Sequence, residues 1–148
     1  MLLQCLIACR LPRLQPTQCL RGIAEAIPLG SHPKVSWVNY AGLPGNRYNA
    51  LASTYFGGRA SRVVSFGVKS GREAGAKFID ALQMILRLVN IGDAKSLACH
   101  PASTTHRQLG PDELARAGGS EDLFRLSVCI EHIDDIIADF AQALDAIT

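Results

Sequence analysis

The sequence has few of the features that directly indicate a catalytic or binding function. Only 6% of its 148 residues are aromatic, 19% are charged, and the net charge is +2. Its five cysteines include no Cys-x-x-Cys pair, which favours neither a disulfide framework nor a zinc site. No Gly-x-Ser-x-Gly elbow is present, and no apolar run approaches the ~18 residues of a membrane span. We therefore expect one ordinary globular domain in a reducing cytoplasm, with no nucleic acid or membrane as partner.

Residues 1–30 contain little folding information. Pro12, Pro16 and Pro28 interrupt any helix, and no acidic residue precedes Glu25. The apolar run before Cys9 is similar to a lipoprotein cleavage box but lacks the basic residues that precede such a run. We treat 1–30 as a poorly specified segment and 31–148 as the folded domain.

From residue 31 onward, hydrophobic periodicity predicts strands and helices. Alternation or continuous apolar character predicts strands at 35–40, 63–68, 96–99 and 124–130. A capping box, Ser70-Gly71-Arg72-Glu73, predicts the start of a helix whose apolar stripe continues to Val89, with Asn90 and Gly92 ending it. A second helix follows from Ile133 to Ile147, with Asp134 and Asp135 in its first turn.

This order of elements predicts an α+β fold. The order is strand, strand, helix, strand, strand, helix. It suits a small, largely antiparallel sheet with helices on one face, which is a two-layer sandwich.

Two groups of residues are candidates for chemistry. His100 and His106 lie six residues apart around Pro101, a spacing that supplies no ligand set, so a hydrogen-bonded loop is favoured over a metal site. Arg125 stands in mid-strand, where its planar guanidinium either binds a carboxylate in two-point contact or pairs with the nearby Glu121 or Asp122. From the residues alone, the surface ion pair is the simpler interpretation.

Several motifs resemble the C-terminal domain of the O-acetylhomoserine sulfhydrylase group, within the Cys/Met-metabolism pyridoxal-phosphate enzymes of fold type I. They are Ser31-His32-Pro33, Val35-Ser36-Trp37-Val38-Asn39-Tyr40, Gly42-Leu43-Pro44, Phe66-Gly67-Val68-Lys69, Asn90-Ile91-Gly92-Asp93, the stretch from His100 to Leu109, and Arg125-Leu126-Ser127-Val128. Asn90 and Ser103-Thr104-Thr105-His106 are more similar to the sulfhydrylases than to the cystathionine synthases and lyases.

The resemblance implies a substrate-binding role for three residues. The arginine of the Arg-Leu-Ser-Val motif, here Arg125, is expected to bind the α-carboxylate of an amino-acid substrate. Asn90 is expected to reach the same carboxylate, and Thr105 to lie close by. One departure stands out, because the family usually has glycine where this chain has Cys129.

The resemblance also implies pyridoxal phosphate, bound through a Schiff-base lysine. That lysine usually follows threonine in a Ser/Thr-rich segment, whereas the four lysines here follow Pro33, Val68, Ala76 and Ala94. We therefore predict no catalytic lysine and no covalently bound cofactor in this chain. The implied activity is the conversion of O-acetylhomoserine and sulfide to homocysteine, in methionine and cysteine biosynthesis, by a protein of which this chain is a fragment inactive by itself.

Other interpretations stay open. The chain is alternatively a noncatalytic module that binds a carboxylate or pairs with an intact paralogue through the surface that the cofactor domain normally covers, or a pseudogene product. Leu2-Leu3-Gln4 resembles the family's entry into its interdomain linker helix, so residues 1–30 are hypothesised to be a linker remnant or a frameshifted stretch. Resequencing the locus tests this, because the hypothesis requires a cofactor-domain remnant beside the start.

Overall fold

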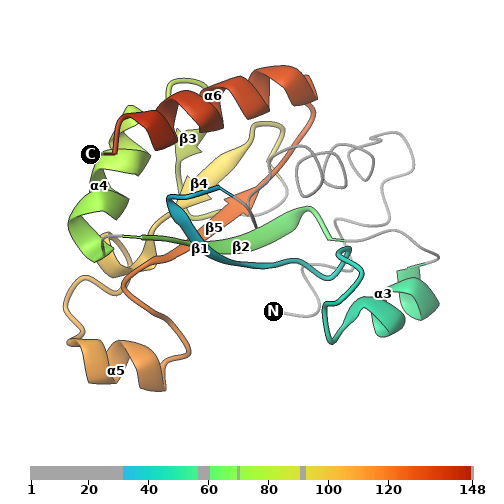
Figure 1. Ribbon diagram of the computed structural model, residues 1–148, viewed down its shortest axis with the longest axis horizontal. Coiled ribbons are helices and arrows are strands. Elements are labelled where there is room, and N and C mark those ends of the chain that lie inside the picture. Colours follow the sequence, from blue (N-terminus) through green and yellow to red (C-terminus); the bar gives the residue numbers. More distant parts are fainter. Residues whose placement is uncertain (1–31, 57–60, 70, 91–92, 148) are drawn as a thin grey trace.

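The computed structural model describes residues 32–56, 61–69, 71–90 and 93–147. In these residues the strands form one five-stranded sheet in the order β1-β2-β5-β4-β3 (Figure 1). The strands are β1 (Val35–Asn39), β2 (Val63–Val68), β3 (Leu86–Arg87), β4 (Leu97–Cys99) and β5 (Leu123–Ser127). All neighbouring pairs are antiparallel except β3 and β4, which are parallel. The predicted α+β class is confirmed.

The helical elements are α3 (Asn49–Phe56), α4 (Gly71–Ala81), the 3₁₀ turn η1 (Pro101–Ser103), α5 (Pro111–Arg116) and α6 (Ile133–Asp145). Figure 1 shows α4 and α6 together over one side of the sheet, while α3 and α5 lie at its periphery. Of α3 only Ala52 is buried, and of α5 only Leu114. The two long helices therefore provide the covering layer.

The core lies between the sheet and these two helices. Four phenylalanines form its centre, with ring centroids 5.1–6.0 Å apart in the contacts between them. They are Phe66, Phe78, Phe124 and Phe140, each at most 1% exposed. Offset and edge-to-face packing of such rings stabilises the fold beyond the area it buries. This cluster joins β2 and β5 to α4 and α6.

The prediction of a helix as far as Val89 was wrong, because α4 ends at Ala81. The carboxylate of Asp139 on α6 accepts the backbone N–H groups of Gln83, Met84 and Ile85 at 2.8, 3.0 and 2.9 Å. In a continuing helix those groups would donate to carbonyls four residues earlier. A contact more than fifty positions away in the sequence therefore ends the helix and lets the chain turn into β3.

The remaining predictions have mixed outcomes. The strands predicted at 35–40, 63–68 and 96–99 correspond to β1, β2 and β4, and the final helix is α6 with Asp134 and Asp135 in its first turn. The strand predicted at 124–130 corresponds to β5 but ends at Ser127, and α6 ends at Asp145 instead of Ile147. No prediction covered α3, β3, η1 or α5. The segment 1–30, Ser70 of the capping box and Gly92 lie outside the described residues.

Candidate functional site

The candidate site begins on the second face of the sheet, the side opposite α4 and α6. Successive strand residues point to opposite faces, so Phe124 and Leu126 enter the core while Arg125 points away from it. Arg125 lies opposite Ser65 of β2 and opposite Cys99 of β4. A row of hydroxyl, guanidinium and thiol groups therefore crosses the three central strands.

The structure brings two predicted site residues together. A terminal nitrogen of the half-buried Arg125 guanidinium donates to the backbone carbonyl of Asn90 at 3.3 Å. That contact uses one of five N–H donors and fixes the direction of the group. Arg125 makes no ion pair with any described residue.

The two carboxylates proposed as surface partners of Arg125 have other partners. Glu121 lies 3.6 Å from the guanidinium of Arg72. Asp122 accepts from the hydroxyl of Ser36 at 2.8 Å and the indole N–H of Trp37 at 2.9 Å. Burial alone would raise the pKa of Asp122, but hydrogen bonds from Ser120, Ser36 and Trp37 outweigh it and lower the pKa.

Thr105 lies on the loop that follows β4. It comes directly after Thr104, whose hydroxyl approaches Cys99, the residue opposite Arg125. Its side chain is exposed, and its hydroxyl is 2.9 Å from Nδ1 of His106. The hydroxyl of the preceding Thr104 donates to the carbonyl of His100 at 2.8 Å and lies 3.7 Å from the thiol of Cys99. Among the described residues Thr105 makes no hydrogen bond to Arg125, so the structure brings it to the neighbourhood but not into contact.

His100 fixes the base of this loop. Its ring is fully buried and stacks on Phe124 with centroids 4.5 Å apart. Nε2 lies 2.9 Å from the carbonyl of Glu121, which only accepts, so Nε2 carries the proton, and Nδ1 accepts from Ser103 at 2.9 Å. Burial lowers the pKa of His100. The hydrogen-bonded loop was therefore the correct interpretation of this histidine.

The segment from Asn90 to Ser96 is fixed at its far end by residues that follow β5. Glu131 accepts from the amide of Ser96 at 2.7 Å and from its hydroxyl at 2.9 Å. The amide of Cys129 donates to the Ser96 hydroxyl at 2.9 Å, and the Cys129 thiol contacts the carbonyl of Asp93. The thiol of Cys129 is thus buried inside this network, and burial raises its pKa.

The lysines of the described residues do not fit the cofactor. The ammonium of Lys34 donates to the carbonyls of Leu144 and Ile147 at 3.0 and 2.7 Å, at the C-terminus of α6. Lys69, Lys77 and Lys95 are exposed.

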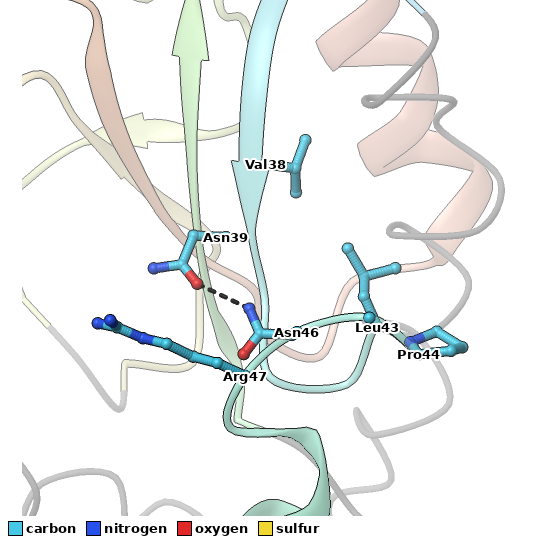
Figure 2. A pocket seen from close by; sticks show the side chains of 7 residues that line it. Val38, Asn39, Leu43, Pro44, Asn46 and Arg47 are labelled. Atoms are coloured by element: carbon cyan, nitrogen blue, oxygen red, sulfur yellow. Dashed lines mark hydrogen bonds between the residues drawn. The ribbon is translucent and has the colours of Figure 1, made fainter.

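A hollow lies at the end of β1, where Asn39 in its lining is opposite Ser65, the residue that is itself opposite Arg125. Val38, Leu43 and Pro44 line it together with Asn39, Asn46 and Arg47, and the Asn46 side chain donates to Asn39 at 2.9 Å (Figure 2). In the part of the chain that the structure describes, no cluster of three metal-ligating side chains occurs. No helix in that part is long and apolar enough to cross a membrane.

Comparison with known proteins decides the family. The model of the Cys/Met metabolism PLP-dependent enzymes matches residues 17–145. The chain belongs to this family. O-acetyl-L-homoserine sulfhydrylase 1 of Thermus thermophilus is 49% identical over 112 residues, which are 76% of this chain and 27% of that protein. Homocysteine synthase of Schizosaccharomyces pombe is 50% identical over 79% of this chain and 27% of its own length.

The fold agrees with this membership. Cystathionine gamma synthase from Xanthomonas oryzae pv. oryzae, solved in complex with cystathionine, matches with a TM-score of 0.78 and 32% identity. The match covers 91% of this chain and 34% of that one. The chain therefore spans about a quarter to a third of the length of these relatives.

Proposed function

We propose that this chain forms the substrate-carboxylate side of an O-acetylhomoserine sulfhydrylase-type site, with Arg125 as the residue that binds the carboxylate. The observation that carries the proposal is the environment of the Arg125 side chain. It is a half-buried arginine on the second face of the sheet, directed by the carbonyl of Asn90 and without a described carboxylate partner. A planar guanidinium held in this way is suited to two-point recognition of a carboxylate.

Asn90 and Thr105 complete the proposed site from two sides. Asn90 follows β3 and already contacts Arg125 through its carbonyl. Thr105 lies on the loop fixed by His100, one residue after the threonine that approaches Cys99. We propose that both side chains contact the bound amino acid, Asn90 at the carboxylate and Thr105 beside it.

The chemistry of the whole relatives depends on pyridoxal phosphate, which provides an electron sink when it is bound. The lysines described above do not fit it, so we propose that the 148-residue chain orients a substrate carboxylate and does not turn over by itself. After incubation with pyridoxal phosphate, we expect desalting to remove the cofactor's absorbance. A band that survives desalting and disappears with borohydride would contradict this.

Calorimetric titration with O-acetyl-L-homoserine tests carboxylate binding directly. We expect a dissociation constant on the order of 1 mM, because one arginine and few further contacts bind a small ligand. Arg125→Ala should abolish binding, and Arg125→Lys should retain part of it. The matched control is Arg116→Ala, which removes an exposed arginine of α5. Equal affinities of Arg125→Ala and the parent chain would refute the proposal.

A second candidate function is a noncatalytic module that pairs with an intact paralogue. Exposed apolar side chains just before Asn90 favour it, namely Leu86, Leu88 and Val89, at 41–50% exposure. Such a patch beside a binding site is typical of a contact surface. Sedimentation of the chain mixed with a full-length sulfhydrylase tests the pairing, and Leu88→Asp should weaken any complex that forms.

A further inference from the structure

The segment that presents Asn90 to Arg125 is short and lies at the edge of the sheet. β3 contains only Leu86 and Arg87, both exposed, at the edge of the sheet. The amides of Leu86 and Leu88 donate to the carbonyls of Ser96 and Ala98 at 3.0 and 3.1 Å. Two such bonds at an exposed edge contribute only modestly to stability. The position of Asn90 therefore depends on how the chain enters β3.

Asp139 determines that entry. Its side chain is on α6, the residue is 7% exposed, and one carboxylate oxygen accepts from Gln83 while the other accepts from Met84 and Ile85. Gln142 supports the same turn, because its amide nitrogen donates to the carbonyl of Ala81 at 2.7 Å and to Asp139 at 3.0 Å. Hydrogen bonds to a charged acceptor are stronger than those between neutral groups.

We infer that Asp139 is a positioning residue for the carboxylate site. It holds the turn at 83–85, the turn sets the course of β3, and β3 places the carbonyl of Asn90 that accepts from the guanidinium of Arg125. This inference rests on the proposed function. Asp139 is not proposed to contact Arg125 or the bound carboxylate. Its effect is to place the carbonyl that directs the guanidinium.

Asp139→Asn is the direct test. An amide has one acceptor oxygen instead of two, so either the amide of Gln83 or the amides of Met84 and Ile85 lose their acceptor. We expect the affinity for O-acetyl-L-homoserine to fall about tenfold at a temperature where the variant is folded, because small displacements of an orienting group have large effects. Gln142→Ala leaves the carboxylate in place, and a smaller loss in the same direction is expected.

Two comparisons separate positioning from general stabilisation. Lys34→Met destabilises the same helix at its C-terminus, where Lys34 donates to the carbonyls of Leu144 and Ile147, and should leave the affinity unchanged. In the Arg125→Lys background, Asp139→Asn should weaken binding by much less than tenfold, because the guanidinium that Asn90 directs is already gone. Equal losses in both backgrounds would overturn the inference.

Amide hydrogen exchange tests the inference even if no ligand binds. In Asp139→Asn the amide of Leu88 should exchange at least about tenfold faster relative to those of Val64 and Leu126 in the central strands. Uniform acceleration, or none, would overturn the positioning role. If Arg125→Ala leaves ligand binding unchanged, the proposed function fails by itself, and the exchange result still decides whether Asp139 holds the segment before Asn90.

Discussion

The two faces of the sheet are made by the same strands and have opposite characters. On the helix-covered face, β2 and β5 contribute Phe66 and Phe124 to a cluster from which solvent is excluded. On the second face the alternate residues, Ser65 and Arg125, lie opposite each other. Neighbouring residues of one strand thus separate the packed core from the face that we propose binds a carboxylate. Stability should respond to changes on the first face and ligand binding to changes on the second.

Substituting the two neighbours in β5 should produce the largest contrast. Phe124→Ala removes a ring that contacts Phe66, Phe78 and His100, so we expect a loss of about 3–5 kcal/mol in the free energy of unfolding. Arg125→Ala, one residue on, should change it by about 0.5 kcal/mol or less. Urea denaturation measures both. Similar losses in the two variants would show that the faces are not separated in this way.

Acid should destabilise the packed face through His100. Its folded-state pKa is lowered, mainly by burial, so the unfolded chain binds protons more readily. The contribution of the neutral ring is therefore fully present above the unfolded pKa of about 6.5 and is lost as the pH falls toward the folded value.

His100→Gln isolates this effect. The difference in unfolding free energy between the parent chain and the variant should shrink as the pH decreases from 7 to 5. A difference that grows on acidification would mean that the histidine is stabilised as a cation, contrary to its contacts with Glu121 and Ser103.

The smallest expected effect comes from the end of α6. Lys34→Met keeps the aliphatic stem but removes the ammonium that donates to the last carbonyls of the helix. Because a cation at a helix C-terminus contributes about 0.3–1 kcal/mol, thermal denaturation should show a small decrease in stability. A larger loss would indicate that Lys34 stabilises more than the end of the helix.

The sequence predicted the fold where local patterns were sufficient. Alternation in β5 and the helical spacing in α6 were read correctly because each pattern reflects burial against the same core. The end of α4 was missed because the apolar stripe continues to Val89, while the group that stops the helix, Asp139, lies far along the chain. One sign was available, since an acid three residues after the buried Ile136 falls on the apolar side of α6.

The candidate site was less accessible to sequence reasoning. The position of Arg125 in mid-strand followed from alternation, but its roles and those of Asn90 and Thr105 came only from the family resemblance. The contact between Arg125 and Asn90 spans 35 positions and depends on β3, for which two residues give no periodic signal. α5 did carry a local signal, because Pro111 follows Gly110 and Glu113 accepts from the Gly110 amide at 3.2 Å.

An NMR titration of the labelled chain with O-acetyl-L-homoserine, repeated with its carboxamide, tests the central claim most directly. If the second face carries the carboxylate site, the acid should shift the side-chain signal of Arg125 and the amides of Asn90 and Thr105, while the carboxamide leaves them unchanged. The amides of Phe66 and Phe140, in the core, should move little with either compound. Shifts confined to residues away from Arg125, or equal shifts with the acid and the carboxamide, would contradict the account.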